Sequence, residues 1–99
     1  MKIVFSEAAE TDLEEIGDYI AQDNARRALT FVRELRVRAQ DISSMLQEFP
    51  RVPPYEHLGI RRRPYGNYLI FYRVDEAGIS IIRILHGAPD YEAPLFAME

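Results

Sequence analysis

Apolar residues near the start of the chain recur at the spacing of an amphipathic helix. The spacings are four, three and four residues, and the apolar face that they define consists of Ala9, Leu13, Ile16 and Ile20. Ser6 can cap this helix, and Glu7 and Glu10 fall in its first turn, where the helix dipole favours acidic side chains. The acidic residues of the opposite face are Asp12, Glu14, Glu15 and Asp18. We expect that face to be solvated, and residues 2–5 to form a short first strand.

A second helical pattern follows and is longer. Its apolar positions alternate between spacings of four and three from Ala28 to Phe49, and Pro50 predicts its end. Asp23 and Asn24 break the first pattern and can cap the second, so the connection between the helices is short. The two segments are therefore predicted to form an antiparallel helical hairpin, one side of which lies on a sheet.

The second half of the chain is rich in β-branched and aromatic residues. Two apolar runs, 68–74 and 79–85, are joined by a turn cluster that ends in Gly78, which predicts an antiparallel hairpin. The shorter run 60–65 precedes them across a Gly-Asn dipeptide, another hairpin signal. We expect an α+β fold of order β-α-α-β-β-β, with a small antiparallel-rich sheet and the N-terminal helical hairpin packed on one face.

The strand predicted over residues 60–65 contains Pro64, which has no backbone N–H to donate to a neighbouring strand. This strand should therefore lie at a sheet edge or contain a bulge. Its three arginines, Arg61, Arg62 and Arg63, would then face water or a partner. A solvated edge with charges that discourage aggregation and a contact surface for another protein both fit this pattern.

The composition fits one small domain spanning residues 1–99, with 47% hydrophobic residues. Without cysteine, the chain has neither disulfides nor a thiolate-bound zinc, and two distant histidines do not make a metal site, so we expect no cofactor and no metal. The N-terminus lacks the features of a secretion signal, and no segment reaches the roughly 20 apolar residues of a membrane span. We expect a cytoplasmic protein with no membrane contact.

Charge is distributed unevenly along the chain. The net charge is −4, yet residues 57–74 contain four arginines and no Asp or Glu. Eleven of the twelve basic residues are Arg, whose planar guanidinium suits bidentate contacts with carboxylates and phosphates. A local positive patch on an acidic protein is therefore expected.

Four segments, in this order and spacing, resemble the ParE/RelE superfamily of toxins from bacterial toxin–antitoxin pairs, and more closely its ParE branch. They are residues 2–21 (KIVFSEAAETDLEEIGDYIA), 62–68 (RRPYGNY), 71–74 (FYRV) and 82–87 (IRILHG). The resemblance implies a type II toxin that is held inactive by a cognate antitoxin. The implied antitoxin is ParD-like, with a DNA-binding N-terminal part and a C-terminal part that wraps the toxin in a hetero-oligomer.

The same resemblance leaves two activities open, cleavage of mRNA on the ribosome and inhibition of DNA gyrase. A metal-free ribonuclease needs an acid, a base and cations around the phosphate. The candidates for those roles are Arg61, Arg63, Arg83, His86 and Tyr91. However, Pro89 stands where many relatives have Arg after His-Gly-Ala, and the chain has one lysine and a pI of about 5.2. Both facts favour a gyrase inhibitor that binds rather than catalyses, which traps the cleaved gyrase–DNA complex.

A third interpretation is a non-toxic module that keeps the fold and the antitoxin contacts. In each case the antitoxin would dock through strand edges and an apolar groove beside the helical hairpin. The residues we assign to partner binding are Arg61, Arg62, Arg63, Tyr65, Arg73, Phe31 and Met45. For Arg73 and Arg83 on the central strands, ion pairs with helix acids are favoured over catalysis. For His86, before Gly87, a structural hydrogen-bonding role is favoured.

Overall fold

The protein is described by a computed structural model that covers residues 2–45, 48–53 and 55–87. Its elements are β1 (Ile3–Phe5), α1 (Glu7–Ala21), α2 (Ala25–Asp41), the 3₁₀ turns η1 (Ile42–Ser44) and η2 (Glu56–Leu58), β2 (Ile60–Tyr65), β3 (Tyr68–Asp75) and β4 (Gly78–His86). The α+β class and the order β-α-α-β-β-β expected from the sequence are confirmed.

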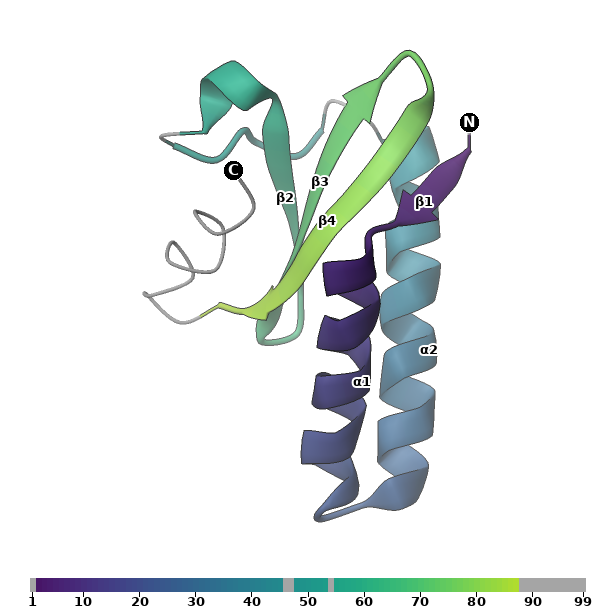
Figure 1. Cartoon of the computed structure of the whole chain (residues 1–99). Helices are drawn as coiled ribbons and strands as arrows, with labels where there is room; N and C mark the ends of the chain where they lie inside the picture. Colours follow the sequence, from purple (N-terminus) through teal and green to yellow (C-terminus); the bar gives the residue numbers. More distant parts are fainter. Residues whose placement is uncertain (1, 46–47, 54, 88–99) are drawn as a thin grey trace.

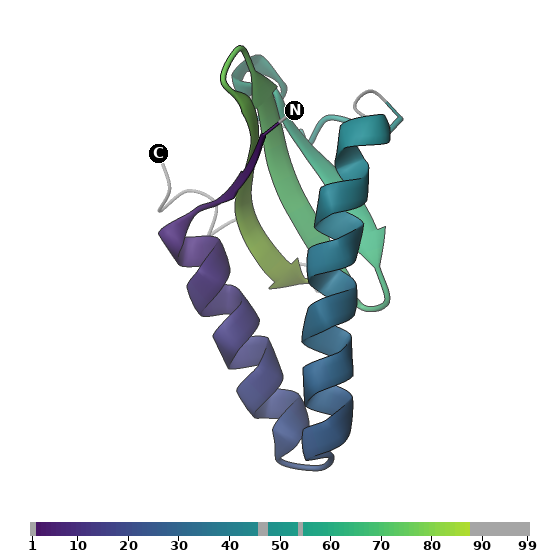
Figure 2. The same ribbon diagram turned by 90° about the vertical axis from the view of Figure 1, so that its right-hand side faces the viewer.

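The four strands form one sheet in the order β1-β4-β3-β2. The three C-terminal strands pair as an antiparallel meander, and β1 adds to β4 in parallel. Pro64 lies on β2, an edge strand, as its missing N–H requires. The helices α1 and α2 lie together on one face of the sheet and extend beyond it (Figures 1 and 2).

Both helices begin at the caps that the sequence predicts. The Ser6 hydroxyl accepts a hydrogen bond from the N–H of Ala9 (3.0 Å), and the Asn24 side chain accepts one from the N–H of Arg27 (3.0 Å). Each cap satisfies an N–H group that the first turn of a helix leaves without a partner. Only residues 22–24 separate the helices, which fixes their antiparallel arrangement.

The second helix is shorter than its apolar spacing predicts. It ends at Asp41 and continues as the 3₁₀ turn η1 instead of reaching Phe49. The hydroxyls of Ser43 and Ser44 donate to the carbonyls of Gln40 (3.1 Å) and Asp41 (2.9 Å), and such local bonds compete with helix continuation. Phe49 still packs against the core, so the apolar spacing correctly marks burial but not helical structure.

The turn between β3 and β4 requires glycine. Gly78 has φ +140°, and a Cβ at this position would overlap the carbonyl oxygen of Lys2. That carbonyl accepts the N–H of Ile79 (2.9 Å), the bond that starts the pairing of β1 with β4. Gly78, which the sequence predicts in the turn, therefore also allows the N-terminal segment to approach β4.

Hydrophobic residues gather on both faces of the sheet. The helix-facing cluster includes Leu13, Leu35 and Tyr72, all with at most 1% exposure. A second cluster on the opposite face consists of Val52, Tyr55, Ile60 and Phe71, with Leu58, Leu69, Ile82 and Leu85 packed against it. The connection between η1 and β2 thus covers part of the face that the helices leave open.

Candidate partner-binding surfaces

One edge of the sheet is completed by side chains of α1 and its cap. The strand β1 pairs only with Ile79–Ile81, so within the described part of the chain the rest of β4 has no strand beside it on that edge. At the end of this pairing, the Ser6 N–H donates to the carbonyl of Ile81 (2.9 Å) and the Ser6 hydroxyl donates to the carbonyl of Ile82 (2.7 Å). A single residue therefore caps the helix and continues the ladder of β4.

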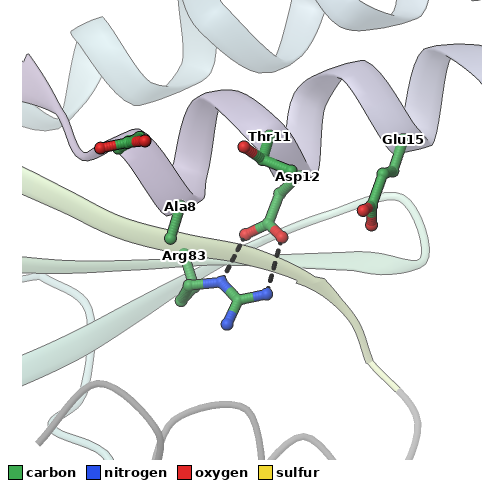
Figure 3. Close-up of a pocket in the computed structure, with 6 residues that line it drawn as sticks. Ala8, Thr11, Asp12, Glu15 and Arg83 are labelled. Atoms are coloured by element: carbon green, nitrogen blue, oxygen red, sulfur yellow. Dashed lines mark hydrogen bonds and ion pairs between the residues drawn. The ribbon is translucent and has the colours of Figure 1, made fainter.

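Asp12 extends this edge further (Figure 3). Its carboxylate accepts two hydrogen bonds from the Arg83 guanidinium, both 2.7 Å, and a third from the backbone N–H of Ile84 (2.9 Å). The side chains of Asp12 and Arg83 are 5% and 18% exposed, and the hydrogen bond to Asp12 raises the pKa of Arg83. A buried carboxylate with three donors is well compensated for its lost hydration.

This ion pair confirms the expectation that Arg83 pairs with a helix acid. It also corrects the interpretation of the acidic face of α1 as wholly solvated, because Asp12 is buried. The reason is its position opposite the part of β4 beyond β1, where the N–H of Ile84 is available to a side chain. Glu14, Glu15 and Asp18 are exposed, as expected.

Arg73 does not follow the same expectation. It is exposed, in register with Ile60 and Ser80 near the end of β3 that joins the turn to β4. It shares the alternation of Leu69 and Phe71, which lie in the cluster on the face away from the helices. The prediction of an ion pair between Arg73 and a helix acid is therefore wrong, because Arg73 lies on β3 near the β3–β4 turn, whereas the buried acid of α1 reaches the sheet on β4, at Arg83.

The opposite edge of the sheet, strand β2, is largely closed by the chain itself. The N–H of Val52 donates to the carbonyl of Ile60 (2.9 Å), and the N–H of Arg62 donates to the carbonyl of Pro50 (3.2 Å). In an edge strand every second residue points its N–H and C=O away from the sheet, and after Arg62 the next such residue is Pro64, which has no N–H. Along residues 62–64, β2 therefore leaves no outward N–H for an added strand.

The three consecutive arginines of β2 are divided between the two faces of the sheet. Arg61 and Arg63 are in register with Tyr72 and Ile70 of the helix-facing cluster, whereas Arg62 is in register with Phe71 on the other face. The Arg61 guanidinium donates to the carbonyl of Phe49 (2.7 Å). The Arg63 guanidinium lies 5.1 Å from the centre of the Phe49 ring. All three side chains are half-buried, so they do not form one continuous exposed patch.

A polar chain links α2 to the end of β2. The Tyr65 hydroxyl donates to Glu34 (2.6 Å), and Glu34 also accepts from the Arg27 guanidinium (2.7 Å). The hydrogen bond from Arg27, together with that from Tyr65, lowers the pKa of Glu34, and the bond to Glu34 raises the pKa of Tyr65. Arg38 lies over the Tyr65 ring at 5.5 Å. Tyr65 is thus held by α2 rather than presented freely to a partner.

An aromatic cleft of about 640 Å³ opens between the helices and the β2–β3 turn. Its lining residues are Tyr19, Ile20, Arg27, Phe31, Gly66, Asn67, Tyr68 and His86. His86 packs edge-on against Tyr68 (5.4 Å between ring centres), and Tyr68 contacts Phe31 (5.6 Å). Burial raises the pKa of Tyr68. Phe31, expected at a partner groove, is a buried residue that also lines this cleft, while Met45 is half-buried after η1.

Comparison with known proteins identifies the family. The family described as "ParE toxin of type II toxin-antitoxin system, parDE" matches residues 3–91. The chain belongs to the ParE toxin family. It is therefore a ParE toxin of a type II toxin–antitoxin system, as the sequence resemblance implied.

A structural comparison agrees in fold with this ParE assignment. A solved structure described as "Chromosomal ParDE TA system from P. aeruginosa" matches with a TM-score of 0.72 and 22% identity, covering 89% of this chain and 97% of that chain. Curated protein sequences give no significant match. The likeness to that structure concerns the fold, and the family assignment rests on the match over residues 3–91.

Among residues 2–45, 48–53 and 55–87, no three His, Asp or Glu side chains gather in a way that would hold a metal ion. No helix in the same part of the chain is long and apolar enough to cross a membrane.

The candidate nuclease residues within the described part of the chain do not converge on one point. Arg61 and Arg63 lie on the helix-facing side of β2, while Arg83 is in register with Phe71 on the other side and pairs with Asp12. His86 ends β4 in the aromatic cleft. Tyr91 lies outside the described residues.

Proposed function

We propose that this ParE toxin acts in the cytoplasm as a binding inhibitor of DNA gyrase, and that its cognate antitoxin neutralises it. The observation that supports inhibition over catalysis is the bidentate pair between Arg83 and Asp12. Arg83 is the candidate cation of the central strands, and both of its bonds to Asp12 are made within the protein. A guanidinium committed in this way is poorly available to a phosphate.

The division of the other arginines supports the same proposal. Stabilisation of a phosphoryl transition state needs several donors aimed at one point. Arg61 and Arg63 lie on the helix-facing side of the sheet, where both contact Phe49. Arg83 is in register with Phe71 on the opposite side. A binding inhibitor needs only complementary surface, and Arg62, Arg73 and the aromatic cleft remain our proposed contacts for a protein partner.

Neutralisation by an antitoxin is supported by the family and by the related structure, whose description names a ParDE system. The surfaces that suit such a partner are the exposed groove between the helices and the aromatic cleft. Because the outward N–H of Arg62 is bonded to Pro50 and Pro64 has none, addition of an antitoxin strand along this part of β2 is disfavoured. The antitoxin is therefore proposed to contact the helical hairpin.

The test is a supercoiling assay with purified gyrase and antitoxin-free toxin, run beside a ribosome-dependent mRNA cleavage assay. The proposal predicts inhibited supercoiling and accumulation of cleaved DNA, both reversed by the antitoxin, with no mRNA cleavage. Cleavage of mRNA on the ribosome without an effect on gyrase would replace it with the ribonuclease alternative. A folded, antitoxin-binding protein inactive in both assays would indicate the non-toxic module.

A further inference from the structure

The aromatic cleft contains hydrogen-bonding side chains that the fold does not use. Four of its lining residues are of this kind, namely Tyr19, Asn67, Tyr68 and His86. Within the described part of the chain, none of these four side chains takes part in a hydrogen bond or a salt bridge, and the contacts of Tyr68 and His86 are between rings. Several polar groups that converge on one cleft without partners indicate a ligand that supplies those partners.

The rings of the cleft come from a helix and from the sheet. Tyr19 lies on α1 and is 69% exposed. Tyr68 and His86 lie opposite each other in the register of β3 and β4. The pKa of Tyr68 is raised by burial and, to a smaller extent, by the neighbouring Tyr19. A volume of about 640 Å³ between rings on two elements suits a flat aromatic ligand of small size.

The charge of the lining is positive. The eight lining residues include Arg27 and no Asp or Glu. The Arg27 guanidinium lies 5.0 Å from the centre of the Phe31 ring and pairs with Glu34 at the surface, where the two side chains are 47% and 34% exposed. Because such an exposed ion pair contributes little to stability, a phosphate can replace Glu34 at small cost. Glu34 then keeps its hydrogen bond from Tyr65 (2.6 Å).

An apolar side chain of another protein fits this cleft less well than a nucleobase does. It would exclude water from the four polar side chains and offer them no partner, which costs the full desolvation of each group. A nucleobase can stack on the rings while the donors and acceptors around its edge form hydrogen bonds. The side-chain amide of Asn67 carries a donor and an acceptor, the pair that the N6 and N7 edge of adenine complements.

We propose that the aromatic cleft of the free toxin binds an adenine nucleotide, with the base between Tyr19 and the Tyr68–His86 ring pair. Asn67 then contacts the edge of the base, and Arg27 contacts the phosphate. A free nucleotide and an unpaired nucleotide of a single strand share this chemistry. The inference goes beyond gyrase inhibition and does not depend on it. A partner that covers the cleft, as proposed for the antitoxin, and the nucleotide exclude each other.

Calorimetry with the antitoxin-free toxin tests the site, with AMP as the first probe. Adenosine and ribose 5-phosphate serve as the two halves of AMP. We expect adenosine to bind several-fold more weakly than AMP because it lacks the phosphate. Ribose 5-phosphate should bind at least roughly tenfold more weakly, since stacking of the base supplies most of the affinity. Ribose 5-phosphate that binds as tightly as AMP would overturn the proposal.

A short single strand of deoxyadenosine and its duplex with the complementary strand distinguish the two sources of the nucleotide. A single strand that binds more tightly than AMP assigns the cleft to an unpaired nucleotide of a strand, and one that binds no more tightly assigns it to a free nucleotide. The duplex should not bind, because its bases are stacked and paired. A duplex that binds as well as the single strand, or a toxin that binds neither AMP nor the strand, contradicts the proposal.

Substitutions of exposed residues locate the site. Asn67→Asp keeps the shape of the side chain but removes the amide donor and adds a negative charge, so it should weaken AMP binding at least roughly tenfold. Gln40→Glu makes the same chemical change at an exposed position of α2 outside the cleft, and it should bind as the wild type does.

Tyr19→Ala should weaken AMP binding at least about fivefold by loss of stacking, whereas Tyr19→Phe keeps the ring and should retain most of the affinity. Leu29→Ala, at a side chain that is 72% exposed and outside the cleft, is the control. Circular dichroism identifies the variants that are folded. Folded Asn67→Asp and Tyr19→Ala variants with the AMP affinity of the wild type would overturn the assignment to this cleft.

Discussion

Two residues of α1, Glu10 and Asp12, form ion pairs with other elements. The two pairs have similar N–O distances but differ in how much of their side chains is exposed. Glu10 pairs with Arg36 of α2 at 2.6 Å, with side chains that are 46% and 41% exposed. Asp12 pairs with Arg83 of β4 at 2.7 Å, with side chains that are 5% and 18% exposed. The first pair lies on the solvent side of the helical hairpin, and the second completes the edge of the sheet.

The comparison shows that burial and additional donors, not the charges alone, decide what an ion pair does for the fold. Water competes for the exposed pair and salt screens it, so its contribution is small. The buried pair contributes through three hydrogen bonds, one of them to the backbone N–H of Ile84, and removal of either partner leaves a buried charge. The Arg83 guanidinium is therefore already bonded to Asp12 in the free protein.

The largest expected effect comes from Asp12→Ala. This change leaves the Arg83 guanidinium and the Ile84 N–H without their acceptor, and loss of one partner from a buried pair costs about 3–5 kcal/mol. Urea denaturation followed by circular dichroism should show a much lower midpoint than for the wild type. Glu15→Ala, which changes an exposed acid of the same helix, is the control. Equal stability of the two variants would contradict the structural role of the pair.

Ser6→Ala should have an intermediate effect. The hydroxyl both accepts from the Ala9 N–H and donates to the Ile82 carbonyl, so alanine removes a helix cap and a bond to the sheet edge. Loss of a cap of this kind costs about 1–2 kcal/mol of unfolding free energy. Ser6→Thr, which keeps the hydroxyl, should lose less. A Ser6→Ala variant as stable as the wild type in urea would show that the bridge from cap to sheet contributes little.

The smallest effect is expected for Glu10→Gln in the exposed pair. Its cost at pH 7 should be about 0.2–1 kcal/mol and should fall in high salt. The hydrogen bond from Arg36 lowers the pKa of Glu10, so the native state favours the ionised form. The stabilisation is therefore present above the ordinary glutamate pKa and lost as the pH falls through the lowered native pKa. Stability curves of wild type and variant should converge below that pH.

Much of the fold could be predicted from the sequence because local signals and periodicity agreed. The caps at Ser6 and Asn24, the two glycine turns and the edge position of Pro64 each follow from the chemistry of one or two residues. The end of α2 could not be placed by apolar spacing, because Ser43 and Ser44 stop the helix through local hydrogen bonds while burial continues.

The candidate site was less predictable because it depends on register and on contacts between distant segments. Arg73 and Arg83 occupy similar sequence contexts, yet only Arg83 lies opposite an acid of α1. The closure of β2 by Pro50 and Val52 joins segments that no sequence period relates. An apolar groove beside the helical hairpin was expected, but the residues that line it can be named only from the packing of α1 against α2.

The central claim, that Arg83 serves the fold and not a reaction, is tested most directly by the double variant Asp12→Asn with Arg83→Met. The asparagine retains an acceptor for the Ile84 N–H, and the methionine removes the charge that would otherwise be buried without a partner. We predict a folded protein that inhibits gyrase supercoiling with the potency of the wild type and is neutralised by the antitoxin. A double variant that folds and binds the antitoxin but has lost its toxic activity would contradict the account.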